Sequence, residues 1–164
     1  MNTRDELLAS LRRAYDGRSW HGSNLLGSIR GLTPEEAFFR PGRGRHTVYD
    51  LVLHAAYWKY VARRRLTGER RGSFPVKGSN FFTEPRVKGD AAVQGARAVL
   101  EEAHRSLVAA VEAMPETAFS ERRGKWTADE LVAGVAAHDL YHAGQIQLVK
   151  KFYAERPRPR RTRK

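Results

Sequence analysis

Apolar side chains recur every three or four positions along four long segments of this chain. The clearest of these segments, residues 90–114, has its apolar positions at Ala96, Val99, Leu100, Ala103, Leu107, Ala110, Val111 and Met114. This spacing lines one face of a helix with apolar side chains, and that face has to be buried against another helix. No segment alternates apolar and polar residues in the manner of a half-buried strand. The sequence therefore predicts an all-α fold, a four-helix bundle.

Capping signals delimit the four helices. We expect them over residues 3–30, 47–67, 90–114 and 127–153. Three of them open on threonine, and an acidic residue three positions later (Glu6, Asp50 or Glu130) can accept a hydrogen bond from the backbone of the threonine. Gly68 and Pro115 mark the ends of the second and third helices, because glycine adopts the left-handed backbone and proline cannot continue a helix.

Two connections between the helices are distinctive. Residues 32–36, Leu-Thr-Pro-Glu-Glu, predict a short extra helical turn, since Thr33 can cap it and proline suits the first helical position. Residues 68–89 form a long loop that is rich in glycine, proline and basic residues but also contains Phe74, Phe81 and Phe82. The phenylalanines favour packing of this loop against the bundle, and its length permits a non-sequential order of the helices.

Length and composition indicate one domain. The chain has 164 residues, 41% of them hydrophobic, which suffices for one buried core, and we expect residues 1–155 to form it. No run of about eighteen apolar residues occurs, and the amino terminus lacks the apolar stretch of a secretory signal. We therefore expect a cytoplasmic protein that makes no membrane contact.

Half of the net charge lies in the last nine residues. The chain carries a formal charge of +12, and residues 156–164 contain six basic residues and no acidic one. Two prolines in this segment prevent a helix. We therefore expect a basic, disordered tail that increases solubility rather than an arm dedicated to nucleic acid.

The chain contains no cysteine. Disulfide bonds, thiolate metal ligands and a cysteine nucleophile are therefore excluded. A thiol that takes part in any chemistry of this protein has to arrive on a substrate.

His138 and His142 are four residues apart in the last predicted helix, so they lie one turn apart and point the same way. Both stand at positions of the apolar seam where leucine or valine is expected. Burying two imidazoles is costly unless their nitrogens find a partner. The spacing alone is common in helices, but the position in the seam favours a chelating pair.

His54 extends this pair to three. The segments that begin at Thr47 and Thr127 are similar in sequence, and His54 lies seven residues after the first threonine, whereas the other two histidines lie eleven and fifteen residues after the second. These offsets differ by single helical turns, so all three share one face. Where two such faces meet, three neutral imidazoles converge as in a catalytic zinc-type site with open positions. The alternative is three hydrogen-bonded core histidines, and the trio favours a metal.

Three nearby residues are candidates for supporting this site. Asp50, one turn before His54, can hold the second imidazole nitrogen, although capping the helix is the simpler role. Trp58 can wall a pocket, although core packing is the simpler role. Gln145, one turn after His142, can contact a bound water or be solvated.

The other histidines, His21, His46 and His104, are interpreted as structural. His104 has Glu101 and Glu102 as neighbours on a mainly exposed helix, and His46 precedes a helix cap. No catalytic residue is named by the sequence.

Several of these segments resemble the DinB-like superfamily, whose YfiT-type members are described as metalloenzymes. The likeness spans about residues 5–153 and is carried by residues 32–36, 47–54 and 126–131, and most specifically by His-Asp-Leu-Tyr-His-Ala-Gly-Gln-Ile at 138–146. It implies a four-helix bundle with a non-sequential helix order, often dimeric, that binds zinc or nickel through His54, His138 and His142. The tail and His46, where many relatives have tryptophan, depart from the pattern.

The same superfamily includes enzymes that use low-molecular-weight thiols, among them bacillithiol S-transferases and the mycothiol-dependent maleylpyruvate isomerase. By analogy we expect a divalent-metal-dependent enzyme that joins such a thiol to an electrophilic small molecule. The absence of cysteine fits this interpretation, because the sulfur nucleophile then comes from outside.

Two alternatives remain open at this point. A metal-dependent hydrolase requires a general base, which the sequence does not identify. A non-catalytic, stress-associated protein could bind nucleic acid through the basic tail and through Arg63, Arg64, Arg65, Arg70 and Arg71.

Overall fold

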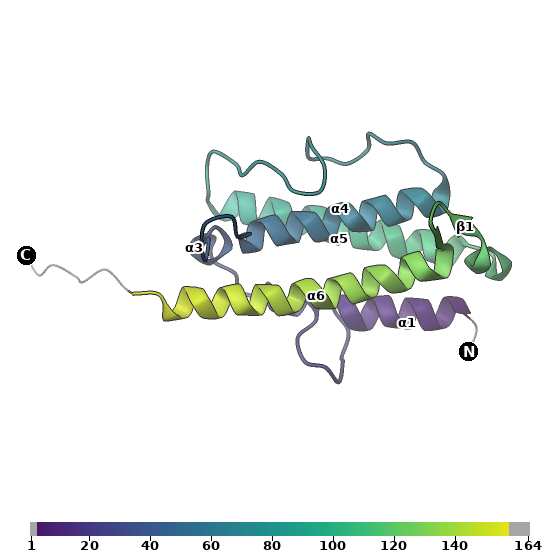
Figure 1. Cartoon of the computed structure of the whole chain (residues 1–164), viewed down its shortest axis with the longest axis horizontal. Helices are drawn as coiled ribbons and strands as arrows, with labels where there is room; N and C mark the ends of the chain where they lie inside the picture. The colour runs from purple at the N-terminus through teal and green to yellow at the C-terminus, as the bar shows by residue number, and fades with distance from the viewer. Residues whose placement is uncertain (1–2, 158–164) are drawn as a thin grey trace, which may run out of the picture.

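The computed structural model describes residues 3–157 and is almost entirely helical (Figure 1). Its helices are α1 (Thr3–Tyr15), α2 (Leu25–Ser28), α3 (Pro34–Ala37), α4 (Val48–Thr67), α5 (Asp90–Ala113) and α6 (Ala128–Glu155). A 3-10 helix, η1 (Glu116–Ser120), and an antiparallel hairpin of β1 (Arg122–Arg123) and β2 (Trp126–Thr127) join α5 to α6. The predicted all-α fold is confirmed. Residues 158–164 of the predicted tail lie outside the described residues.

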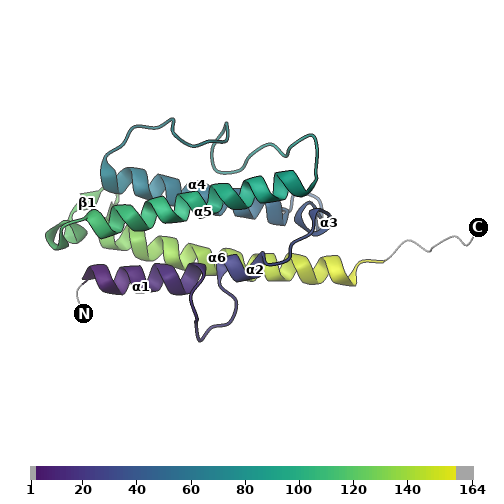
Figure 2. The ribbon, with the colours of Figure 1, turned by 180° about the vertical axis from the view of Figure 1, so that it is seen from behind.

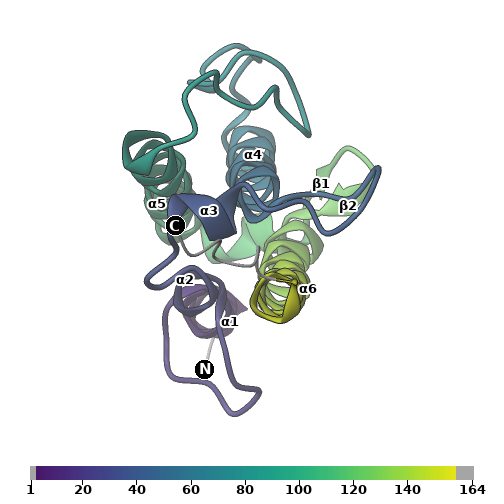
Figure 3. The same cartoon turned by 90° about the vertical axis from the view of Figure 1, so that its left-hand side faces the viewer.

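The four long helices form a bundle in which neighbours in sequence are not always neighbours in space. α4 packs on α5 and α6, whereas α1 packs on α6 and α5 (Figure 3). α1 and α4 therefore stand diagonally opposite, as do α5 and α6, which confirms the predicted non-sequential order. α4 and α5 run in the same direction (Figures 1 and 2), so the segment 68–89 returns along the length of the bundle.

The helix predicted over residues 3–30 is wrong in its extent. The structure divides it into α1 and α2, which a loop over residues 16–24 separates. Gly17 allows a tight turn after α1, because a Cβ there would lie 2.9 Å from the carbonyl oxygen of Arg12. The Gly22 backbone is left-handed, with φ of 99°, which glycine adopts without strain. Asn24 then opens α2 by accepting a hydrogen bond from the Gly27 backbone at 2.7 Å.

The predicted ends of α4 are confirmed. The Thr47 hydroxyl accepts a hydrogen bond from the Asp50 backbone at 3.1 Å, and the Asp50 carboxylate accepts one from the Thr47 backbone at 3.0 Å. Gly68 ends the helix with a left-handed φ of 75°. These caps fix where the helix begins, and so they decide which of its residues face α6. None of the described helices combines the length and the apolar character that a bilayer span requires.

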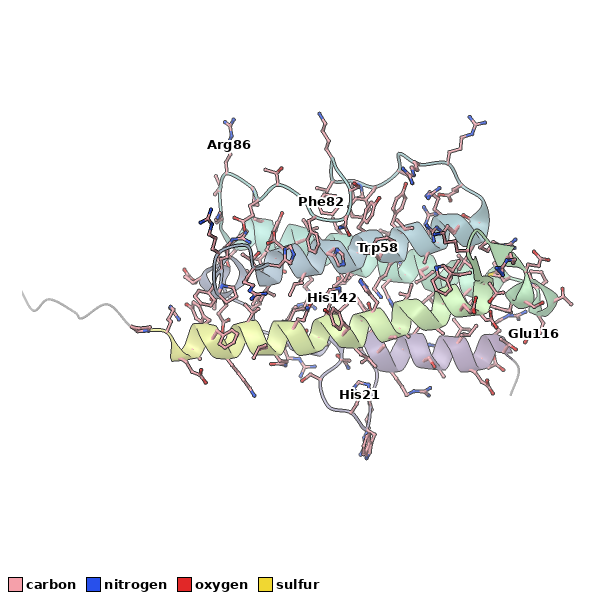
Figure 4. The ribbon with its side chains drawn as sticks, viewed as in Figure 1. His21, Trp58, Phe82, Arg86, Glu116 and His142 are labelled. Atoms are coloured by element: carbon pink, nitrogen blue, oxygen red, sulfur yellow. The ribbon has the colours of Figure 1, made fainter. Side chains whose placement is uncertain are left out.

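The segment 68–89 packs across α4, as its phenylalanines predict. Phe74 and Phe82 contact Tyr57 of α4, with ring centroids 5.3 and 5.7 Å apart. Figure 4 shows Phe82 above α4, on the side away from α6. This packing brings the residues just before Phe82 close to His54.

Candidate metal centre

His54 on α4 meets His138 and His142 on α6, which runs antiparallel to α4. The Nε2 atom of His138 lies 3.2 Å from Nε2 of His54 and 2.9 Å from Nε2 of His142. One ligand atom from each of the three residues lies within 4.8 Å of the others. Figure 4 shows His142 on the side of α6 that faces α4, whereas His21 lies on the loop at the opposite side of the bundle. The three rings thus converge on one point between the two helices.

The outer nitrogens of two of these rings face hydrogen-bond acceptors. Nδ1 of His54 lies 3.1 Å from the backbone oxygen of Asn80, and Nδ1 of His142 lies 2.7 Å from the side-chain oxygen of Gln145. Because a carbonyl oxygen only accepts, each Nδ1 carries the proton, and each Nε2 presents a lone pair to the centre. Histidines that bind metals in proteins are oriented in this way.

The converging nitrogens do not satisfy one another as hydrogen-bond partners. Two lone pairs already face the centre, and a proton on Nε2 of His138 can be donated to only one of them. Burial lowers the pKa of His54, that of His138 to about 3 and that of His142 to about 4, so neutral imidazoles prevail at neutral pH. Nitrogens about 2.0–2.1 Å from a tetrahedral ion lie about 3.3 Å apart, close to the separations here. The residues therefore fit a divalent metal ion.

Two residues of the segment 68–89 complete the surroundings of His54. Phe81 stacks between the rings of His54 and His46, with centroids 4.3 and 3.8 Å away. Asn80 has a left-handed φ of 64°, and its side-chain oxygen accepts a hydrogen bond from the Trp58 indole at 3.0 Å. Neither contact is predicted by the sequence, in which the only indication is the presence of phenylalanines in a glycine-rich loop.

The three supporting candidates take different positions. Asp50 caps α4 and lies 3.3 Å from the Arg40 guanidinium, while the second nitrogen of His54 faces the Asn80 backbone instead. Gln145 is half-buried and contacts His142 directly. The rings of Trp58 and His54 meet edge to face, with their centroids 6.3 Å apart. Trp58 also lines a cavity beside the site.

A charged pair lies buried next to the histidines. The Lys59 ammonium contacts the Asp139 carboxylate, and neither side chain is exposed to solvent. Burial lowers the pKa of Lys59 and raises that of Asp139, whereas the attraction between the two charges acts in the opposite direction. The pair joins α4 to α6 at the residue that follows His138. In the sequence, this buried pair is indicated by the position of Lys59 among the apolar residues of α4.

His104 was expected on a mainly exposed helix but is only 8% exposed. Its ring stacks on Tyr15 at a centroid distance of 3.6 Å, and Tyr15 also lies under the Lys59 ammonium, 5.1 Å from its ring centroid. The expected structural role therefore fits, but the expected exposure was wrong. The flanking glutamates are exposed, whereas His104 occupies the inward face of α5.

A cavity of about 500 Å³ opens between α4 and α6 beside His138. Its lining is mostly apolar and consists of Trp58, Val61, Ala62, Arg65, Trp126, Glu130, Leu131, Ala133, Gly134, Val135 and His138. The volume lies in the range of sites for small molecules. His138 lines this cavity, so the cluster of three histidines adjoins a pocket of suitable size.

Some of the arginines considered for nucleic-acid binding are engaged within the chain. Arg63 forms two hydrogen bonds with the Glu69 carboxylate at 2.5 and 2.6 Å, and Arg64 donates to the Glu69 backbone oxygen at 3.3 Å. These contacts reduce the positive charge that this region offers to a phosphate backbone.

Comparison with known proteins gave one match. The family model described as the DinB superfamily matches residues 19–146, a region that includes all three histidines. Searches of curated proteins and of solved structures gave no match.

Proposed function

The chain belongs to the DinB superfamily, and on that basis we propose that His54, His138 and His142 bind a divalent metal ion, zinc or nickel, in a metal-dependent enzyme. The observation that carries this proposal is the set of Nε2 atoms 2.9 and 3.2 Å apart, whose lone pairs face a common centre. Without a cation at this centre at least one lone pair has no partner, and three imidazoles leave further coordination positions open to a substrate.

The reaction that we propose is the transfer of a low-molecular-weight thiol to an electrophilic small molecule. A divalent ion in such a site supplies positive charge that lowers the pKa of a nearby thiol. The thiol loses its proton to solvent, its sulfur bonds to the electrophilic carbon, and the leaving group departs with its electron pair. The chain has no cysteine, so the only sulfur nucleophile is the one that the substrate brings.

The residues of the chain supply orientation and exclude water. The backbone oxygen of Asn80 and the side-chain oxygen of Gln145 accept hydrogen bonds from Nδ1 of His54 and of His142, and so they hold these rings in place. Phe81 covers one face of His54. The adjoining cavity positions the electrophile close to the open side of His138.

Hydrolysis is supported less well, because it needs a general base near the histidines. Within residues 3–157, the group of converging ligands contains no carboxylate. Asp50 is committed to a helix cap, and Asp139 to the buried pair with Lys59.

Elemental analysis of the purified protein tests the metal proposal. We expect about one divalent ion per chain in the wild type and in a His21→Ala control, whose histidine lies far from the site, and little metal in His142→Ala. A wild-type protein that neither retains a divalent ion nor binds an added one would overturn the proposal. Consumption of a thiol and an electrophile, measured beside ester hydrolysis, then separates the two reactions.

A further inference from the structure

We infer that the groove between α4 and α6 binds a small organic anion with a flat apolar body, oriented with its anionic group away from the histidines. This inference rests on the proposed function in one respect only, that the occupant is the electrophilic substrate.

One face of α4 and one face of α6 form the walls of the groove. α4 contributes Trp58, Val61, Ala62 and Arg65, and α6 contributes Leu131, Gly134, Val135 and His138, with Glu130 and Ala133 beside them. Each set has the spacing i, i+3, i+4 and i+7, which places its members on one side of a helix. Because the helices are antiparallel, the two faces run alongside each other and enclose about 500 Å³.

The lining suits a flat apolar group. Trp58 and Trp126 are 37% and 52% exposed, so each indole is open to stacking. A Cβ added at Gly134 would have no atom within 4 Å, which makes this glycine an open part of the wall. An aromatic body that enters the groove therefore meets indole and aliphatic surfaces without displacing a side chain.

The two ends of the groove differ chemically. His138 lies at one end, and Arg65 and Trp126 lie at the other. Arg65 lies seven positions after Trp58 on α4, a rise of about 10 Å along the helix. This length accommodates an aryl group with a short side chain, whose reactive atom then lies near His138.

The end of the groove away from His138 is positively charged, and some of its arginine groups have no hydrogen-bond or ion-pair partner among the described residues. Within residues 3–157, Arg65 takes part in no ion pair or side-chain hydrogen bond. It also lines an adjoining pocket together with Arg64, Arg123 and Lys125. The Nε atoms of Arg64 and Arg123 are shielded from solvent and have no partner among the described residues. Such donors favour a carboxylate or another anionic group.

The acidic residues at this end are already engaged. The Glu130 carboxylate accepts a hydrogen bond from the Thr127 backbone at 2.8 Å. Glu69 pairs with Arg63, and Glu121 pairs with Arg123. The charges of Glu69 and Glu121 are thus balanced by arginines, whereas Glu130 keeps its charge, so an incoming anion has to place its charged group at Arg65 and Lys125 rather than beside Glu130.

Calorimetric titration of the full-length, metal-free protein with 2-naphthylacetate and with its neutral amide tests this inference. We expect the anion to bind about tenfold more tightly than the amide, because a charge-assisted hydrogen bond to Arg65 is made only by the anion. Arg65→Gln should remove this difference and leave binding of the amide unchanged. The matched control is Arg70→Gln, an exposed arginine that lines no part of the groove.

Gly134→Leu provides a second test, because a Cβ at this position meets no atom within 4 Å and the new side chain extends into the groove. It should reduce the affinity for both probes at least tenfold. The control is Gly95→Leu on α5, where a Cβ also has free space. Thermal unfolding checks that both variants are folded.

Equal affinities of the wild type for the anion and the amide, or unchanged binding to Gly134→Leu, would overturn the inference. Neither measurement uses a metal ion, so both are readable even if the histidines bind none. Binding of the anion by a protein that takes up no metal supports the groove and counts against the proposed function.

Discussion

The side-chain oxygen of Gln145 lies 2.7 Å from Nδ1 of His142, one helical turn away on α6. The amide nitrogen of the same side chain donates a hydrogen bond to the Tyr141 hydroxyl at 3.0 Å. The glutamine is therefore held at both ends, and it fixes the imidazole with Nε2 toward the other two histidines. This geometry connects Gln145 to the affinity of the proposed metal site, although Gln145 is not one of the three proposed ligands.

Gln145→Leu should lower the affinity for zinc about ten- to a hundredfold, because the His142 ring loses the acceptor that orients it. Competition with a chelating dye measures this change. Gln94→Leu on the exposed side of α5 is the matched control and should bind zinc as the wild type does. Equal affinity of the two variants would contradict the role assigned to Gln145.

Asn80 offers a test of the backbone contact to His54. Asn80→Gly keeps the left-handed backbone and the carbonyl, so its zinc affinity should stay within about threefold of the wild type. Asn80→Val strains this conformation by about 1–2 kcal/mol. Relief of the strain moves the carbonyl away from His54, and the zinc affinity should fall about tenfold. The same dye competition compares both variants, and a valine variant as tight as the glycine variant would refute the argument.

The buried ion pair predicts a strong non-additive effect on stability. Lys59→Met leaves the Asp139 carboxylate buried without its partner, which should lower the free energy of unfolding by about 3–5 kcal/mol. Lys59→Met combined with Asp139→Leu should recover most of this loss, because both charges are then removed. Urea unfolding measures all three proteins.

The control for this cycle is Arg97→Met, which breaks a pair with Glu101 on the surface of α5. Because both partners are well exposed, the expected loss is below about 1 kcal/mol. A double variant as unstable as Lys59→Met alone would show that the charges are not the source of the effect.

Because of His104, we expect the protein to lose stability in acid. Burial, followed by the charge of Lys59, lowers its pKa to about 3, whereas a histidine in the unfolded chain titrates near about 6.5. The unfolded chain thus takes up the proton first, and stability is lost as the pH falls from about 6.5 toward 3. At about pH 5 the loss from this residue is about 2 kcal/mol.

His104→Phe keeps a ring against Tyr15 and removes this contribution, so its free energy of unfolding should fall less between about pH 7.5 and about pH 5. His21→Phe, at an exposed position, should retain the acid sensitivity of the wild type. Urea unfolding at the two pH values compares them. The same loss of stability in His104→Phe and in the wild type would refute the assignment.

The predictions that the structure confirms concern residues on regular helices. The spacing of His138 and His142 from Thr127, and of His54 from Thr47, is a property of helix geometry, so the sequence was sufficient to place them on one face. The capping threonines defined that register.

The features that the sequence did not predict depend on irregular backbone or on a charged residue in the interior. The contacts of Asn80 and Phe81 follow from the path of the segment 68–89, which no periodicity describes. The burial of Lys59 was not predicted, because a lysine is expected on the surface and because its partner, Asp139, is eighty residues away in the chain. The break between α1 and α2 was hidden by apolar residues that continue the helical pattern on both sides of the loop.

The diagonal placement of α1 and α4, and of α5 and α6, has a consequence for folding kinetics. A cut within the segment 68–89 leaves two fragments, each holding one diagonal pair of long helices that lack a shared interface. One fragment carries His54 and the other carries His138 and His142. Every large interface thus joins distant parts of the sequence, which slows folding relative to an up-and-down bundle. Ligands that bind only the native state stabilise it more as their concentration rises above the Kd, so zinc bound at the proposed site would favour reassociation of the two fragments.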